Sequence, residues 1–164
     1  MKNKGVKALT VSALVAALYV ALTYVSFALG LSSGAIQFRL SEVLCVLVYF
    51  TPYATYGLSV GCFLANLLTG CAPLDIIFGT LATFLGAFVG SKMKNKYLVP
   101  LPTVISNALI VPFVIMYCYS NEANPFVYFS NLVGVVIGET AMAYVLGLLL
   151  LKALEKNNAF KNLK

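Results

Sequence analysis

The sequence predicts an all-α membrane protein with a single domain over residues 1–164. Of its 164 residues, 61% are hydrophobic and only 10% are charged, and the mean hydropathy is +0.94. Soluble domains are close to half apolar and a quarter charged, so this composition indicates that lipid is the solvent. The chain contains no histidine, which removes the commonest general base and metal ligand. These observations exclude a disordered chain and disfavour a metalloenzyme.

Long apolar runs predict six membrane-spanning helices, at approximately residues 8–29, 36–50, 52–70, 73–91, 98–119 and 126–151. Five runs are long enough to cross about 30 Å of hydrocarbon at about 1.5 Å per residue. The second run is short before the break at Thr51 and Pro52. We expect it to cross by recruiting residues from Ile36 onward, or to lie in a thin or protein-lined region. Pro52 disfavours helix at Thr51, so we expect a turn there.

The distribution of lysines predicts that both chain ends are cytoplasmic. With six crossings, 10 of the 11 basic residues fall on the inner side, and only Arg39 lies outside. Five crossings would place the C-terminal lysines on the outer side, against the positive-inside rule. The net charge of +6 is therefore a topology signal, and we expect no nucleic-acid partner.

Small residues recur at four-residue spacing, a pattern that lets helices approach closely in lipid. Ala13, Ala17 and Ala21 form such a stripe on the first helix. Packing inside the bundle and docking of a partner protein both explain this stripe. For the glycine-containing stripes on the third, fourth and sixth helices, internal packing is sufficient.

Several polar side chains lie within or beside the apolar runs, where a charge at the bilayer centre costs about 2.5–3.5 kcal/mol. We predict that they line one substrate pocket that opens outward. Helical spacing places Asn131 and Glu139 on one face, and depth places Asn107 beside Glu139 as the floor of the pocket. The candidate residues are Gln37, Arg39, Glu42, Asn66, Asp75, Asn107, Asn131 and Glu139.

Structural roles compete with binding for some of these residues. Arg39 and Glu42 are three residues apart, so they are expected to pair if both lie on one helix. Asp75 follows a proline by two residues and suits the first turn of a helix, where its charge meets the helix dipole. Asn66 and Asn107 suit hydrogen bonds between helices.

Glu139 has no basic residue at its depth, so we expect a cationic ligand, a proton or an asparagine to satisfy it. A small proton-coupled carrier with Glu139 as its protonation site is therefore a rival interpretation. An intramembrane enzyme is disfavoured because no GxSxG motif accompanies the missing histidine. The four cysteines show no CxxC spacing, and GxxxxGK[ST] is absent. We therefore predict no metal, no cofactor and no ATP hydrolysis by this chain itself.

Five segments, taken together and in this order, resemble the QueT family: GAIQFRLSEVL, GCFLANLLTG, LDIIFGTLATFLGA, LPTVISNALIV and VGVVIGETAMAYVLG. Its members are substrate-binding S components of energy-coupling factor (ECF) transporters, associated with salvage of queuosine precursors. The resemblance covers roughly residues 8–151. It implies the six-helix S-component fold, with a pocket near the outer ends of helices four to six that the loop after helix one closes.

The same resemblance implies partners and a substrate class. The partners are a transmembrane T component, on which the alanine stripe of helix one docks, and two cytoplasmic ATPases. The substrate class is a 7-deazaguanine, whose edge carries N–H donors for a carboxylate and a carbonyl for Asn, Gln or Arg. We expect Glu139 and Asn107 to read this edge, with Glu42 or Asp75 nearer the mouth.

The predicted function is capture of a queuosine precursor outside the bacterial cell membrane for ATP-driven uptake. An S component for another vitamin-like heterocycle is the nearest alternative. A tyrosine or phenylalanine is expected to stack on the flat ring. The chain has 10 tyrosines and 11 phenylalanines, and the sequence does not select one of them.

Overall fold

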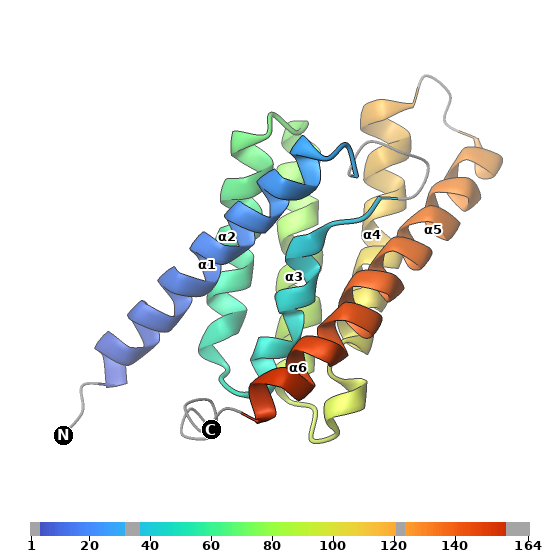
Figure 1. The fold of residues 1–164 in the computed structure, drawn as a ribbon. Helices are drawn as coiled ribbons and strands as arrows, with labels where there is room; N and C mark the ends of the chain where they lie inside the picture. Colours follow the sequence, from blue (N-terminus) through green and yellow to red (C-terminus); the bar gives the residue numbers. More distant parts are fainter. Residues whose placement is uncertain (1–3, 32–36, 121–123, 157–164) are drawn as a thin grey trace.

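The computed structural model is an all-helical bundle and describes residues 4–31, 37–120 and 124–156 (Figure 1). Within these residues the chain makes six helical passages, which alternate in direction along the bundle. Their bounds are α1 Lys4–Ala28, η1 Leu40–Tyr49, α2 Tyr53–Leu68, α3 Pro73–Ser91, η2 Lys96–Leu98 leading into α4 Leu101–Tyr119, and α5 Pro125–Glu139 continuing through η3 Thr140–Leu146 into α6 Gly147–Glu155. The predicted number of helices agrees with this arrangement, but six membrane crossings stay a prediction.

In the described part of the chain, four of these passages are long and apolar enough to cross a membrane. They are Lys4–Ala28, Pro73–Ser91, Lys96–Tyr119 and Pro125–Glu155, and the two shorter apolar helices are Leu40–Tyr49 and Tyr53–Leu68. Together they make the chain a membrane protein. The turn predicted at Pro52 is also present, because Thr51 lies outside any helix and α2 begins directly after the proline.

The second helix differs from the prediction at its start. Gln37, Phe38 and Arg39 are not helical, and Arg39 is extended, with φ −95° and ψ 101°. The Phe38 N–H donates to the Leu31 carbonyl and the Leu40 N–H donates to Ser26 Oγ, both at 2.9 Å. These bonds tie the segment to the end of α1, so its N–H groups are not used in a helix. Residue 36, the predicted start, lies outside the described residues.

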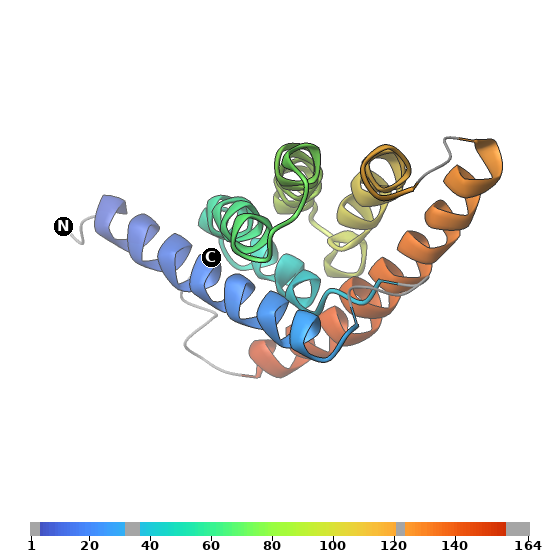
Figure 2. The ribbon, with the colours of Figure 1, turned by 90° about the horizontal axis from the view of Figure 1, so that it is seen from above.

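η1 itself is a 3₁₀ helix of 10 residues, which reaches about 20 Å at the larger 3₁₀ rise of about 2.0 Å per residue. It lies at the centre of the bundle and packs against α1, α2, α3, η3 and α6. Seven of its residues are buried, among them Glu42 and Val46. Seen from above, α2, α3 and α4 stand in a row, while α1 and the α5–α6 passage cross them on the side where η1 lies (Figure 2). The extended residues before η1 therefore enter the bundle from its upper end.

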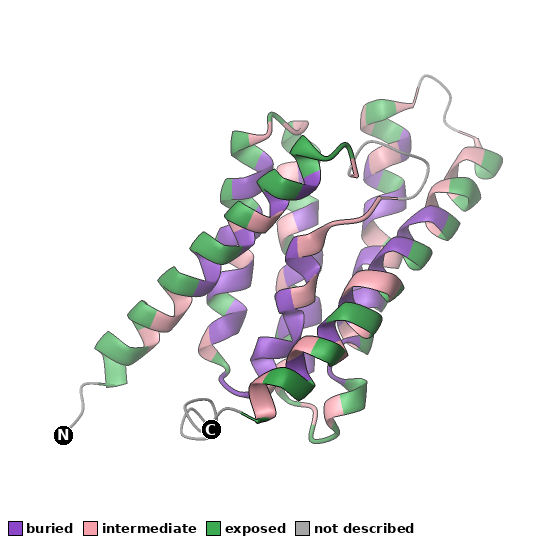
Figure 3. Ribbon diagram, in the orientation of Figure 1, coloured by how far each residue is buried: buried purple, intermediate pink, exposed green. Residues whose placement is uncertain are grey.

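Two faces of α1 have different surroundings. Val15 and Tyr19 are buried against α2, where a Cβ at Gly57 would come within 2.7 Å of the Val15 Cβ and one at Gly61 within 2.7 Å of the Tyr19 Cβ. Only glycine permits this approach. The opposite face carries the alanine stripe Ala13, Ala17 and Ala21, and all three residues are exposed. Exposed residues run along the whole length of α1 (Figure 3). Among the described residues, the stripe is therefore not part of the buried packing of the bundle.

The charged residues separate towards the two ends of the bundle. The described lysines lie at the start of α1, in the connection from α3 to α4 and in α6, which all lie at the lower end in Figure 1. There Lys96 Nζ pairs with Glu155 Oε2 at 2.8 Å. The upper end carries Arg39 and Asp75 instead. This separation agrees with the lysine distribution used to predict the topology.

Candidate functional site

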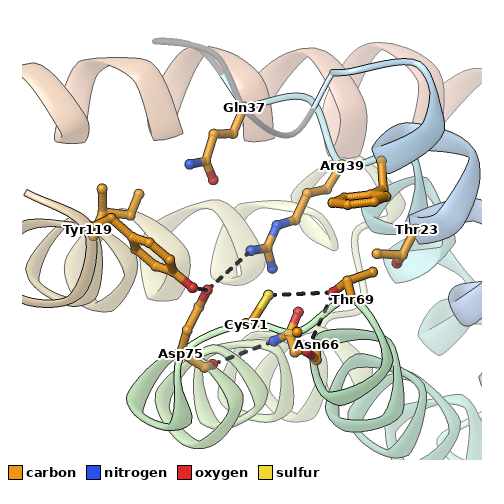
Figure 4. A pocket seen from close by; sticks show the side chains of 11 residues that line it. Thr23, Gln37, Arg39, Asn66, Thr69, Cys71, Asp75 and Tyr119 are labelled. Carbon is orange, nitrogen blue, oxygen red and sulfur yellow. Dashed lines mark hydrogen bonds and ion pairs between the residues drawn. The ribbon is translucent and has the colours of Figure 1, made fainter.

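A cavity of about 360 Å³ opens at the upper end of the bundle, within the roughly 300–1,000 Å³ range of small-molecule sites. Its walls come from the end of α1, the extended segment before η1, the α2–α3 connection and the end of α4 (Figure 4). The lining residues are Thr23, Phe27, Gln37, Arg39, Asn66, Thr69, Gly70, Cys71, Asp75, Ile115 and Tyr119. We call it the outer cavity. It brings together four of the predicted site residues from three separate stretches of sequence.

Arg39 and Asp75 supply the charges of the outer cavity. Arg39 Nη2 lies 3.9 Å from Asp75 Oδ2, and the Asp75 side chain is only 6% exposed. Tyr119 donates its hydroxyl to the same oxygen at 3.1 Å. Asp75 is in the first turn of α3, after Pro73 at the helix start, so the helix dipole also favours its charge. The predicted helix-terminal role of Asp75 is present together with its place in the cavity wall.

Asn66 joins α2 to α3 beside this ion pair. It is buried, and its Nδ2 donates to the Asp75 carbonyl at 3.5 Å and approaches Cys62 Sγ at 3.6 Å. The interhelical hydrogen bond predicted for Asn66 is therefore present, and the side chain also lines the outer cavity. Thr69 Oγ1 and Cys71 Sγ lie 3.5 Å apart in the turn that follows α2. This turn forms the α2–α3 wall.

A second, much smaller cavity adjoins the first and shares Gln37 and Arg39 with it. We call it the inner cavity, and its other lining residues are Asn107, Val111, Val135 and Glu139. Its volume is about 10 Å³, which holds about one water molecule. Glu139 and Asn107 are 8% and 3% exposed, so they face the interior and line a common space, as predicted.

Two polar atoms of the inner cavity have no hydrogen-bond partner within the described residues. They are Glu139 Oε2, an acceptor, and Asn107 Nδ2, a donor. The two side chains are nevertheless close enough to interact with each other, so a guest would bind between neighbouring groups. A buried polar group without a partner costs about 1–3 kcal/mol, and more when it is charged. Glu139 is also the last residue of α5 before the π-helical turn η3, a local distortion that is frequent at functional sites. The arrangement is therefore suited to a guest that both donates and accepts hydrogen bonds.

Glu42 has a different environment from the one its spacing suggests. Pairing of Arg39 and Glu42 as helix neighbours was the simple structural alternative, and it is wrong because Arg39 precedes the helix and pairs with Asp75. Glu42 instead accepts a hydrogen bond from the hydroxyl of Tyr19 on α1. Glu42 lines neither of the two cavities described here.

Asn131 lies one helical turn above Val135 and two above Glu139, on the face that was predicted. Its Nδ2 atom is buried and has no partner in the part of the chain that the structure describes, but the residue lines neither cavity. The structure thus gathers Gln37, Arg39, Asn66 and Asp75 around the outer cavity and Asn107 and Glu139 around the inner one. Which of them contact a substrate stays a prediction.

Sequence reasoning did not select six of the outer-cavity side chains: Thr23, Phe27, Thr69, Cys71, Ile115 and Tyr119. Most of them are common in membrane helices and their ends, so their type carries no signal. Tyr119 has one usable clue, because it ends its apolar run beside the loop and is positioned like an interfacial tyrosine. Among the described residues, no group of three or more His, Cys, Asp or Glu side chains is arranged to hold a metal ion.

Comparison with known proteins gives a family and one relative. Residues 9–156 match the sequence model of the family described as the QueT transporter. A curated protein named queuosine precursor transporter QueT, from Lactococcus lactis subsp. cremoris (strain MG1363), is 34% identical over 101 residues, which are 59% of this chain and 59% of that protein. The match therefore covers less than two thirds of the relative's length. No solved structure matches the chain.

Proposed function

The chain belongs to the QueT transporter family, and we propose that it captures a queuosine precursor of the 7-deazaguanine class as the S component of an ECF-type importer. The family is one of transporters and not of enzymes. The printed name of the Lactococcus relative supports the substrate class. In this account the pocket faces the outside of the cell and the lysine-rich end faces the cytoplasm.

The observation that carries the proposal is the pair of unpartnered atoms in the inner cavity. A deazaguanine edge presents an N–H donor next to a carbonyl acceptor. Glu139 Oε2 and Asn107 Nδ2 present an acceptor and a donor, which is the complementary pattern. A charge-assisted hydrogen bond to the carboxylate is among the stronger ones available to a ligand. Binding would remove the cost of leaving both buried atoms unpaired.

Different parts of the ligand would occupy the two cavities. The flat ring requires the outer cavity of about 360 Å³, because the inner cavity of about 10 Å³ admits only an edge atom or a small substituent. Gln37 and Arg39 line both cavities, so their side chains stand between the two spaces. Asp75 then lies nearer the mouth and accepts from, or balances the charge of, whatever part of the ligand remains in the outer cavity.

The exposed face of α1 supports the assembly part of the proposal. Ala13, Ala17 and Ala21 are small and exposed, so another transmembrane helix can approach this face closely. We assign it to the T component. The chain has no GxxxxGK[ST] motif, so ATP hydrolysis belongs to a pair of partner ATPases.

Ligand binding by the purified protein tests the substrate class. Isothermal titration with 7-aminomethyl-7-deazaguanine, queuine and riboflavin is expected to give saturable binding of at least one deazaguanine and none of riboflavin. Binding of riboflavin alone would favour an S component for another heterocycle. No affinity for any deazaguanine would remove the proposed substrate.

Replacement of one alanine tests the docking face separately. Ala17→Leu adds bulk to the exposed stripe and is expected to abolish uptake in cells while leaving ligand affinity within about threefold, because the residue lies away from both cavities. Val133→Phe adds bulk to an exposed position on α5 and serves as the control, with uptake retained. Equal uptake by wild type and Ala17→Leu would show that the stripe is not the docking face.

The unpartnered Oε2 atom of Glu139 also permits a proton-coupled carrier, since a buried carboxyl group is a natural protonation site. The two functions differ in their energy source. Uptake that continues when the partner ATPases are inactivated, and stops when the proton gradient is dissipated, would favour the carrier. The S-component proposal predicts the reverse result in both experiments.

A further inference from the structure

The outer cavity contains one aromatic side chain whose position is fixed by hydrogen bonds, and this is Tyr119 at the end of α4. Its hydroxyl accepts from the Ala72 backbone N–H at 2.9 Å and donates to Asp75 Oδ2 at 3.1 Å. Both partners belong to the start of α3, where Ala72 is the residue before the helix. One hydroxyl thus ties the end of α4 to the start of α3 and restricts rotation of the ring.

The ring of Tyr119 is available to a ligand although its hydroxyl is engaged. The residue is 54% exposed, whereas the Asp75 residue to which it is bonded is 4% exposed. Figure 4 shows Tyr119 on one side of the cavity and Thr23 on the other, with Arg39 reaching between them towards Asp75. A flat molecule in this space therefore meets the aromatic side chain on the α4 side and the Arg39–Asp75 pair beside the Tyr119 hydroxyl.

Phe27 is the other aromatic residue in the lining of the outer cavity, as far as the described residues show. It is 56% exposed, and a phenylalanine ring has no polar atom by which the protein can fix its orientation. A group that is held in place before binding loses less freedom when the ligand arrives. Tyr119 is therefore the better-prepared stacking surface of the two.

We infer that Tyr119 is the residue on which the flat heterocycle stacks, and that its hydroxyl simultaneously holds Asp75 in position to accept a hydrogen bond from the same ligand. This inference rests on the proposed function and specifies which aromatic residue and which carboxylate act together. It requires a planar ligand with an N–H donor on its edge. Aromatic faces are suited to any nitrogen heterocycle, so stacking gives affinity while Asp75 contributes selection.

The absence of tryptophan from the sequence allows a direct optical test. Tyr119→Trp introduces a single tryptophan at the proposed stacking position, and Tyr117→Trp introduces one two residues earlier, where the side chain is 68% exposed and lines a separate apolar groove. Titration with 7-aminomethyl-7-deazaguanine is expected to change the emission of the first variant saturably and to leave the second unchanged. Equal responses from the two variants would overturn the inference.

Two further substitutions keep the inference testable if a tryptophan disturbs the cavity. Tyr119→Leu removes the ring and is expected to weaken binding about tenfold or more, in line with base stacking on aromatic residues. Tyr119→Phe keeps the ring and is expected to lose only a few-fold, through looser control of Asp75. Tyr117→Leu is the matched control, with unchanged affinity.

The outcomes separate this inference from the proposed function. If the wild-type protein binds no deazaguanine, the proposed substrate fails and takes the inference with it. If the wild type binds and Tyr119→Leu binds equally well, the substrate stands and the stacking role of Tyr119 is wrong. If Tyr119→Phe loses as much affinity as Tyr119→Leu, the hydroxyl alone matters and stacking is again excluded.

Discussion

Glu42 and Glu139 are two carboxyl groups with almost the same burial and very different surroundings. They are 2% and 8% exposed. Glu42 accepts a hydrogen bond from the hydroxyl of Tyr19, and this bond joins η1 to α1. Glu139 keeps its Oε2 atom without a donor from any described residue and faces the inner cavity.

The comparison teaches that burial alone does not identify a binding carboxylate in a membrane protein. A buried charge is costly wherever it lies, and the protein can reduce that cost internally or leave it to a ligand. The charge of Glu42 is stabilised inside the protein, because its hydrogen bond with Tyr19 links η1 to α1. Glu139 has no donor at its Oε2 atom among the described residues, and we propose that a ligand supplies one. Asp75 lies between these extremes, because it is partnered and also lines the outer cavity.

The largest effect is expected at Glu139. Glu139→Gln keeps the size of the side chain but removes the negative charge, so the affinity for 7-aminomethyl-7-deazaguanine should fall about 100-fold, near the upper value for a hydrogen bond to a charged group. Isothermal titration measures the affinity, and the elution volume on size exclusion checks folding. An affinity within threefold of wild type would make Glu139 structural, like Glu42.

A smaller loss is expected at Asp75. Asp75→Asn removes the charge from the outer cavity but leaves an oxygen that can still accept from Tyr119, so affinity should fall about tenfold. The same titration measures it. Asp75→Asn should also release Arg39 from its ion pair. If Asp75→Asn loses more ligand affinity than Glu139→Gln does, Asp75 is the more important of the two carboxylates for binding.

Tyr19→Phe is expected to separate stability from binding. The substitution leaves the Glu42 Oε1 atom without its donor, so the protein should lose about 1–3 kcal/mol of stability, while ligand affinity changes by less than about threefold. Thermal unfolding in detergent measures the first quantity and titration the second. A large loss of affinity with unchanged unfolding temperature would place Tyr19 and Glu42 in the binding machinery.

The smallest effect is expected at the opposite end of the bundle. Lys96→Gln breaks the ion pair between Lys96 and Glu155, whose side chains are 30% and 32% exposed, respectively. Solvent-exposed ion pairs contribute little to stability. Neither ligand affinity nor the unfolding temperature should change measurably. A loss of binding in this variant would mean that the two ends of the bundle are coupled.

Much of the fold could be predicted because membrane helices are constrained by length, prolines and lysines. The start of η1 could not, since the bonds from Phe38 and Leu40 to the end of α1 are tertiary. Because Arg39 was expected to be helical, its spacing predicted a pair with Glu42, and this prediction was wrong. The partner it has in the structure, Asp75, is 36 residues away in the sequence and is reached only through packing of the segment before η1 against α3.

The geometry around Glu139 could be predicted from helix spacing and depth, whereas contacts that depend on side-chain packing could not. Spacing along α5 correctly placed Glu139 on an inward face, and depth placed Asn107 in the same cavity. Tyr19 was missed because a tyrosine in an apolar run resembles a lipid-facing residue. Its signal was the small or polar character of Ala16, Thr23 and Ser26 on the same buried face of α1.

Mass spectrometry of the small molecule that copurifies with the protein addresses the role of Glu139 most directly. The wild type and Glu139→Gln would be purified side by side from cells supplied with queuosine precursors. We predict that a 7-deazaguanine is released from the wild type and is strongly depleted in the variant. Equal amounts from both proteins, or an unrelated molecule in the wild type, would contradict a ligand that satisfies this buried carboxylate.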